Sequence, residues 1–244
     1  MRSTRVVSLA TDAEKQRVTL LMVESARSSA KLSPMAASKL AGRLGFACAW
    51  AACRIGRAAM QPIYRRASAD AARSHATDVA LDASLDFFAS IMGRAGGIPP
   101  KLYFLGTRRR PVVRVWTDAS AGETLGEHGR LGFVVCFPAE ELRGKLVPER
   151  WVHGSAPVPD DFVERFAARK TYIGQFELMA AVCVYCSLPE LAGRAVLHFV
   201  DNTSALAAMA KGYSRAIDSA RIVHALHAWN VGAGVAAWFE YVNT

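Results

Sequence analysis

The sequence lacks the features that mark membrane-spanning and secreted proteins. Its longest apolar segment, residues 44–53, is too short to cross a bilayer and is flanked by arginines. The first residues, MRSTRVV, lack the continuous apolar run of a secretory signal peptide. The cysteines number five, and an odd count does not fit the disulfide framework of a secreted domain. We therefore expect an intracellular protein without a membrane partner, in either the nucleus or the cytoplasm.

Several common catalytic and cofactor motifs are also missing. The chain has no phosphate-binding glycine loop, no dinucleotide fingerprint and no Ser-His-Asp set. Cys183 and Cys186 form a CxxC motif, but no second pair or nearby histidine completes a zinc site, so we interpret them as packing thiols. His198 lies in an apolar strand and is expected in the core. His224 and His227 are interpreted as packing or surface residues.

Acidic residues are scarce in the first part of the chain. Residues 1–110 contain 18 lysines and arginines but only 7 acidic residues. Residues 111–244 contain 12 lysines and arginines and 14 acidic residues. The net charge of +9 therefore belongs to the first part. A basic module beside a nearly neutral one suggests a polyanionic partner, of which nucleic acid is the commonest. A basic surface that only confers solubility fits the same numbers.

Helical patterns dominate the first 110 residues. The apolar spacing predicts helices over residues 13–30, 35–60 and 81–95. We expect Pro62 to end the second helix. We divide this part into a basic helical segment, residues 1–66, and a linker with one amphipathic helix, residues 67–110. On the second helix, Lys39 and Arg43 form a candidate phosphate-binding edge, although an ordinary solvated face explains them equally well.

The second part of the chain mixes strand and helix patterns. Strands are predicted at residues 114–117, 133–137, 151–153, 195–200 and 235–242. Helices are predicted at residues 173–188, 203–211 and 216–229. The stretches 138–150 and 160–170 are interpreted as surface insertions. A strand meander followed by helical crossovers to parallel strands predicts an α/β fold with a mixed five-stranded sheet and flanking helices.

Three acidic residues stand in apolar surroundings in this second part. Asp118 and Asp201 each follow an apolar strand, and Glu177 lies in an otherwise uncharged apolar helix. Alone, each aspartate fits an ordinary turn or helix cap, and Glu177 fits an exposed helix position. Adjacent parallel strands would bring both aspartates to one edge of the sheet, where the helix could aim Glu177. Three such carboxylates repel one another unless cations neutralise them, and oxygen ligands suit Mg²⁺ or Mn²⁺. Two such ions about 4 Å apart can hydrolyse a phosphodiester.

Three motifs, in this order, resemble those of a known family. TDAS at 117–120, QFELMAA at 175–181 and FVDNTSAL at 199–206 resemble the ribonuclease H family, and more narrowly the ribonuclease H-like domain of retrotransposon reverse transcriptases. That resemblance covers residues 111–244. Residues 32–66 resemble the helical thumb or connection segment that precedes this domain. The polymerase palm and its paired aspartates are missing from the chain, so no polymerase activity is expected.

The resemblance implies a function and a set of site residues. Asp118, Glu177 and Asp201 would be the catalytic metal ligands, with the attacking water held between two Mg²⁺ or Mn²⁺ ions. The reaction would be hydrolysis of the RNA strand of an RNA–DNA hybrid. Ser120 and Asn202 would contact the nucleic-acid strand. The polymerase portion of a reverse transcriptase would be a further partner.

One departure from the family pattern leaves alternatives open. The family supplies a fourth carboxylate after the fifth strand, but this sequence ends at WFEYVNT, and Glu240 lies inside that strand. We therefore expect a C-terminally truncated domain that binds a second ion poorly. A catalytically degenerate nucleic-acid-binding remnant of a reverse transcriptase is the main alternative. A transposase or integrase is a third, although its usual Asp, Asp, Glu order differs from the Asp, Glu, Asp order here.

Overall fold

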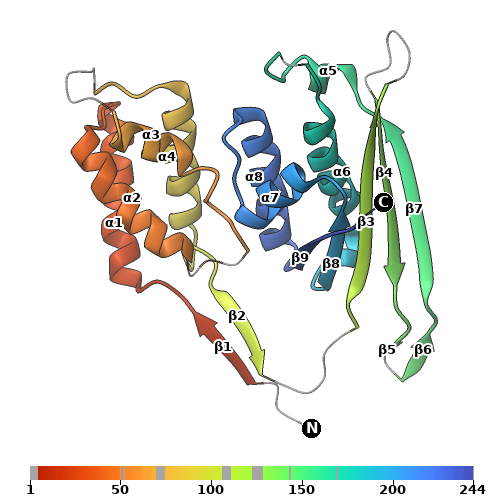
Figure 1. The fold of residues 1–244 in the computed structure, drawn as a ribbon. Coiled ribbons are helices and arrows are strands. Elements are labelled where there is room, and N and C mark those ends of the chain that lie inside the picture. Colours follow the sequence, from red (N-terminus) through yellow and green to blue (C-terminus); the bar gives the residue numbers. More distant parts are fainter. Residues whose placement is uncertain are drawn as a thin grey trace. The chain divides into compact units, whose positions relative to one another are not determined.

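The structure, a computed structural model, describes residues 5–49, 51, 53–69, 75–105, 111–122, 129–142, 144–168 and 170–243. The chain divides into unit 1 (Met1–Gly106) and unit 2 (Thr107–Thr244) (Figure 1). Part of the expected linker, residues 70–74 and 106–110, lies outside the described residues. Within the described ranges, no helix has the length and apolar character needed to cross a membrane.

Unit 1 consists of helices and a two-stranded antiparallel sheet. β1 (Arg5–Leu9) pairs with β2 (Lys101–Leu105), two strands that are far apart in the sequence. The helices are α1 (Ala13–Ser29), α2 (Pro34–Ala49), α3 (Gln61–Ala67) and α4 (Val79–Met92). α1 packs against α4, and α2 packs against α3. The buried apolar residues include Val23, Leu40, Leu44, Ile63, Leu85 and Phe88.

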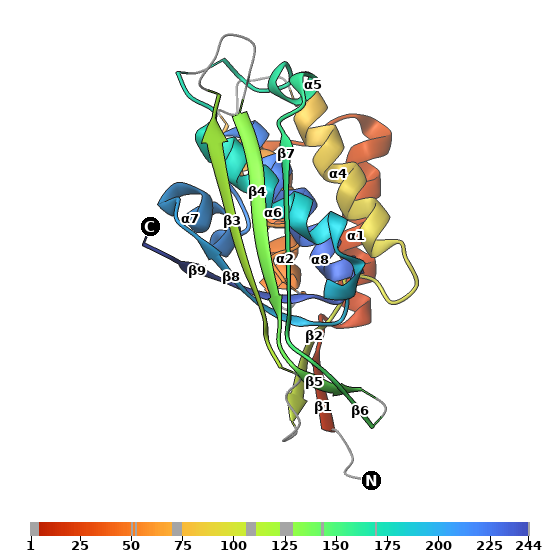
Figure 2. The ribbon, with the colours of Figure 1, turned by 90° about the vertical axis from the view of Figure 1, so that its right-hand side faces the viewer.

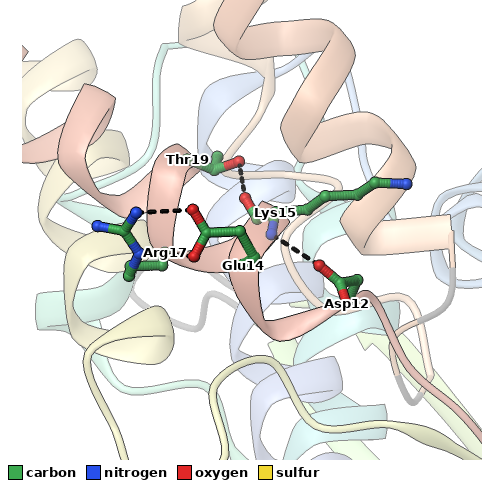
Figure 3. Close-up of polar contacts among 5 residues, drawn as sticks. All are labelled: Asp12, Glu14, Lys15, Arg17 and Thr19. Carbon is green, nitrogen blue, oxygen red and sulfur yellow. Dashed lines mark hydrogen bonds and ion pairs between the residues drawn. The ribbon is translucent and has the colours of Figure 1, made fainter.

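Polar contacts define the start of α1 (Figure 3). Asp12 caps the helix, because its Oδ1 accepts a hydrogen bond from the Lys15 backbone N–H at 3.1 Å. Arg17 donates two hydrogen bonds to the Glu14 carboxylate, at 2.6 and 2.7 Å. Thr19 Oγ1 donates to the Lys15 carbonyl at 2.7 Å. A capping aspartate satisfies an otherwise unpaired first-turn N–H group, which typically stabilises a helix by about 1 kcal/mol.

The single helix expected over residues 35–60 is wrong. α2 ends at Ala49, and the chain turns before α3 begins at Gln61. Cys53 and Gly56 both adopt positive φ, 53° and 85°, which a continuous right-handed helix does not allow. Pro62 lies in the first turn of α3 instead of ending a helix, a position where its missing N–H has no helical partner to lose.

Unit 2 is built on a mixed five-stranded sheet. Its strands are β3 (Val113–Ala121), β4 (Gly129–Phe137), β7 (Arg150–Pro157), β8 (Ala195–Val200) and β9 (Ala236–Tyr241). Their order across the sheet is β7-β4-β3-β8-β9. β3, β4 and β7 are antiparallel neighbours, whereas β8 lies parallel to both β3 and β9. The predicted α/β fold with a meander and parallel crossovers is confirmed.

Helices cover one face of this sheet. They are α6 (Ile173–Ser187), α7 (Thr203–Lys211) and α8 (Ile217–Gly232). Figure 2 shows β3, β4 and β7 in front of α6 and α8, and α6 packs directly on β3 and β4. The buried core between sheet and helices includes Val113, Val115, Val135, Leu178, Ala181, Val184, Tyr185, Val196 and Leu226. α6 is therefore held tightly against the central strands.

The segments interpreted as insertions contain short elements of their own. β5 (Glu140–Leu142) and β6 (Lys145–Val147) form a small hairpin, α5 (Asp160–Val163) is a single turn, and Pro189–Leu191 is a 3-10 turn after α6. Arg194 joins the hairpin to the sheet through a 2.6 Å ion pair with Glu140. Residues 123–128, in the predicted turn between β3 and β4, lie outside the described residues.

The opposite face of the sheet carries exposed and half-buried aromatic residues. Trp116 on β3 stacks on Trp151 of β7 and on Phe199 of β8, with ring centroids 5.7 and 5.2 Å apart. Trp238 on β9 is 67% exposed. Side chains alternate between the two faces along a strand, so Val113 and Val115 enter the core while Trp116 points to this open side.

Candidate metal centre

The two aspartates lie side by side at the point where β3 and β8 separate. β3 does not stop at residue 117 as predicted, because its pairing with β4 continues through Asp118 to Ala121. Pairing between β3 and β8 ends earlier, at Trp116 and Phe199. Asp118 and Asp201 each lie two positions beyond the last residue that pairs β3 with β8. The parallel register thus brings together two residues that are 83 positions apart in the sequence.

Glu177 reaches the same place from α6. It follows Phe176, which packs in a cluster with Ala119 and Leu131 and so holds the start of the helix against β3 and β4. The Glu177 side chain is buried, with only 3% of the residue exposed. The alternative that Glu177 occupies an exposed helix position is therefore wrong.

The three carboxylates form a compact cluster. One carboxylate oxygen from each of Asp118, Glu177 and Asp201 lies within 4.8 Å of the others. Asp118 is exposed and Asp201 is half-buried, so the cluster is open to solvent on one side. Oxygen ligands lie about 2.1 Å from Mg²⁺, and two ligands of one ion are thus at most about 4.2 Å apart. Side-chain movements of roughly an ångström would bring all three oxygens onto one cation.

The electrostatics of Glu177 favour a cation. Burial raises the pKa of Glu177 to about 8, with further contributions from the charges of Asp201 and Asp118, while the backbone N–H of Ala119 lowers it slightly. Glu177 Oε2 is buried and has no hydrogen-bond partner among the described residues. An unpaired buried carboxylate oxygen is costly, and a hard cation would remove that cost. The oxygen-only donor set fits Mg²⁺ or Mn²⁺.

The other predicted site residues are distributed over both units. Ser120 is exposed on β3, two residues beyond Asp118. Asn202 caps α7, where its Oδ1 accepts a hydrogen bond from the Ala205 N–H at 3.0 Å. Lys39 and Arg43 belong to unit 1, where both are exposed on α2.

A buried histidine network lies next to the cluster. His198 on β8 is fully buried and is hydrogen-bonded to Thr117 Oγ1 at 2.8 Å and to the Tyr185 hydroxyl at 3.2 Å. Burial lowers the pKa of His198 to about 3, so the ring is neutral at physiological pH. This network joins β3, β8 and α6 one residue before Asp118. The core position of His198 was predicted from the sequence, but the role of Thr117 as its partner was not.

The remaining candidates do not join the cluster. His227 is buried, with its Nε2 2.9 Å from the Met209 carbonyl oxygen, and burial lowers the pKa of His224. Cys183 is half-buried and Cys186 is exposed, and both are free thiols. Among the described residues, Glu240 is not part of the carboxylate group and instead accepts a hydrogen bond from the indole of its neighbour on β9, Trp238.

Comparisons with known proteins found low sequence identity and low structural similarity. No family model matches the chain, and no curated protein matches it. Among solved structures, RNase H1 from the halophilic archaeon Halobacterium salinarum NRC-1 is 14% identical with a TM-score of 0.38, over 54% of this chain and 86% of that chain. The native protease-reverse transcriptase of prototype foamy virus is 11% identical with a TM-score of 0.34. That match covers 58% of this chain and 20% of the viral chain.

The strand order and directions are the stronger basis for the fold class. A three-stranded antiparallel meander continues into two parallel strands reached through helices, which is the arrangement predicted from the order of strand and helix patterns in the sequence. Unit 2 therefore has an α/β fold with a mixed five-stranded sheet and flanking helices.

Proposed function

We propose that the protein is a divalent-metal-dependent nuclease that hydrolyses the RNA strand of RNA–DNA hybrids. Asp118, Glu177 and Asp201 are its metal ligands and catalytic residues. One observation carries the proposal: three carboxylates from β3, α6 and the end of β8 converge within 4.8 Å, one of them buried. Such an arrangement is costly for folding unless a cation occupies it. Mg²⁺ or Mn²⁺ is therefore the expected cofactor, with two ions for full activity.

The three ligands have different tasks. Glu177, buried on α6, would hold the cation from the protein side, whereas Asp118 is exposed on the solvent side, where a phosphodiester could approach. Asp201 stands one residue before the cap of α7 and is the third ligand. When bound, such ions activate a water for attack on phosphorus and stabilise the leaving oxygen.

The substrate assignment comes from charge and from the resemblance. The first 110 residues carry a net charge of +11, from 18 basic and 7 acidic residues, which favours a nucleic-acid partner. Hybrid specificity, an origin in a retrotransposon reverse transcriptase and partnership with its polymerase portion follow from the motifs at 117–120, 175–181 and 199–206. Ser120, Asn202, Lys39 and Arg43 are the proposed contacts to the nucleic acid.

A second candidate function is a catalytically degenerate nucleic-acid-binding remnant. It is favoured by the composition of the cluster, because the described residues bring three carboxylates together and no fourth. Three ligands can hold one ion while leaving a second poorly bound, and a two-ion mechanism would then be slow.

A cleavage assay separates the two functions. Labelled RNA–DNA hybrid is incubated with the full chain in Mg²⁺ or Mn²⁺, alongside Asp118→Asn, Asp201→Asn and the control Glu141→Gln, which changes an exposed acid on β5. The nuclease proposal expects cleavage by the wild type and the control, and its loss in both aspartate variants. Salt-sensitive binding without cleavage in either metal supports the remnant.

A further inference from the structure

A chain of buried polar groups links α6 to α8. Gln175, Ser219 and Asp218 are each more than nine-tenths buried. Gln175 Nε2 donates a hydrogen bond to Ser219 Oγ at 2.8 Å. Asp218 Oδ1 accepts the Ser219 backbone N–H at 2.7 Å. Buried polar side chains are costly unless paired, so this chain serves either stability alone or a specific geometry.

The same aspartate also fixes the segment that precedes α6. Asp218 Oδ2 accepts a hydrogen bond from the Ala167 backbone N–H at 3.2 Å. Phe166, the residue before it, packs against Tyr172 and Phe176 at the start of α6. Asp218, in the first turn of α8, therefore holds the chain leading into α6 directly and is linked to the start of α6 through Ser219.

Gln175 is well placed to control where Glu177 points. The two residues are two positions apart on α6, which places their side chains about 200° apart around the helix axis. A hydrogen bond on the α8 side therefore fixes the rotation of the turn that presents Glu177 on the opposite side. A carboxylate roughly 5–6 Å from the axis moves by about 2 Å when the helix turns by about 20°. Ligand distances at a metal site are met within about 0.2 Å, so a small rotation is sufficient to lose the ligand.

The cluster itself opposes this placement. Asp118 and Asp201 repel an ionised Glu177, and turning α6 would relieve the repulsion. The apolar packing of Phe176 resists separation of helix and sheet but is not directional. A hydrogen bond is directional, and the bond between Gln175 and Ser219 supplies that restraint.

We propose that Asp218, Ser219 and Gln175 are positioning residues of the carboxylate site, which hold the start of α6 at the rotation that presents Glu177 to the metal. This inference rests on the proposed metal-binding function. None of the three residues is a ligand. Their loss should weaken metal binding beyond what a general loss of stability explains.

The test is a Mn²⁺ titration of the full chain, followed by the electron paramagnetic resonance of free and bound Mn²⁺. Ser219→Ala and Gln175→Met each remove one partner of the hydrogen bond, and Ser219→Thr keeps the hydroxyl. The matched control is Ser84→Ala, which deletes another buried serine hydroxyl, bonded to the Ala59 carbonyl in unit 1. Thermal melting by circular dichroism shows that each variant is folded at the titration temperature.

We expect the Mn²⁺ dissociation constant to rise about tenfold in Ser219→Ala and Gln175→Met, the size of effect that a lost buried hydrogen bond produces. The double variant should be no weaker than the single ones, Ser219→Thr should recover most of the affinity, and Ser84→Ala should bind as the wild type does. Equal affinity in all variants of a wild type that binds Mn²⁺ overturns this inference alone. A wild type that binds no Mn²⁺ overturns the proposed function and this inference with it.

Discussion

At the scale of single residues, Glu177 determines the properties of the site. It is a buried acid beside two further carboxylates, and its Oε2 has no hydrogen-bond partner among the residues that the structure describes. Asp118 and Asp201 are more exposed than Glu177, and without Glu177 these two aspartates would not indicate a metal site. All three acids can be singled out in the sequence because their surroundings are apolar. An acid in an apolar strand or helix needs a compensating charge.

The raised pKa of Glu177 predicts how stability depends on pH in the absence of metal. The folded protein holds this proton up to about pH 8, whereas the unfolded chain loses it near the ordinary value of 4.5. The folded state therefore binds more protons between these values, and the free energy of unfolding falls as the pH rises through this window. Glu177→Gln removes the ionisable group and with it this loss of stability. At pH 8 in EDTA the variant should gain a few kcal/mol in the free energy of unfolding, and its melting temperature should rise by several degrees.

The control for this prediction is the same pair of proteins at pH 4.5, where Glu177 is protonated in the folded state. The wild type and Glu177→Gln should melt at similar temperatures there. A difference in melting temperature that is the same at pH 4.5 and pH 8 would show that Glu177 keeps an ordinary pKa.

The same shift predicts the pH dependence of metal binding. A cation binds the ionised carboxylate, so below about pH 8 it must displace the proton of Glu177. The affinity for Mg²⁺ should rise by up to tenfold per pH unit between pH 6 and 8 and then level off. Calorimetry in two buffers of different ionisation enthalpy should detect the release of close to one proton at pH 6. Binding without proton release at pH 6 would contradict the assigned role of Glu177.

At the scale of elements, local sequence patterns predicted the helices and strands of unit 2 more completely than those of unit 1. The predicted bounds of β8 and α7 match the structure, because an apolar strand ends at Asp201 and Asn202 caps the next helix. The pairing of β1 with β2 was not predicted, since it joins residues far apart in the sequence. β3 also extends past Asp118, because its pairing with β4, and not its own local sequence, determines how long the strand is. Convergence of the site could be predicted because parallel neighbours place their ends together.

Two glycines near α2 provide a test of unit 1 at this scale. Gly56 has a φ of 85°, and a Cβ there would lie 2.7 Å from Cys48 Sγ, so Gly56→Ala should destabilise the protein by roughly 1–3 kcal/mol. Gly42 lies inside α2 with nothing within 4 Å of a Cβ, so Gly42→Ala should stabilise it by about 1 kcal/mol. Urea unfolding of both variants measures these changes. Equal changes in the free energy of unfolding for the two variants would mean that the turn between α2 and α3 is not formed.

At the scale of the whole molecule, the excess positive charge and the three carboxylates lie in different parts of the chain. Residues 1–110 hold the excess of lysine and arginine, and residues 111–244 hold the three acids. Composition indicates this division, but it cannot indicate how unit 1 folds, because arginines on a helix surface do not specify its partners.

This division predicts a salt-dependent affinity for nucleic acid. The logarithm of the binding constant should fall linearly with the logarithm of the salt concentration. Replacing Lys39 and Arg43 with glutamine should lower the slope by up to about 2 if each contacts one phosphate. The control Arg17→Gln changes an arginine already paired with Glu14 and should leave the slope nearly unchanged. Fluorescence anisotropy with labelled RNA–DNA hybrid measures the slopes, and identical slopes for all three proteins would remove Lys39 and Arg43 from the interface.

The proposed function requires that Asp118, Glu177 and Asp201 bind one divalent cation together. Crystals of the protein grown with Mn²⁺ test it directly, because the anomalous signal of manganese locates the ion independently of the protein atoms. We predict an anomalous peak about 2.1–2.2 Å from an oxygen of each of the three carboxylates, a distance close to that of Mg²⁺ ligands. Crystals that diffract well and contain Mn²⁺ elsewhere, but show no peak between these side chains, would contradict the binding of one cation by all three carboxylates.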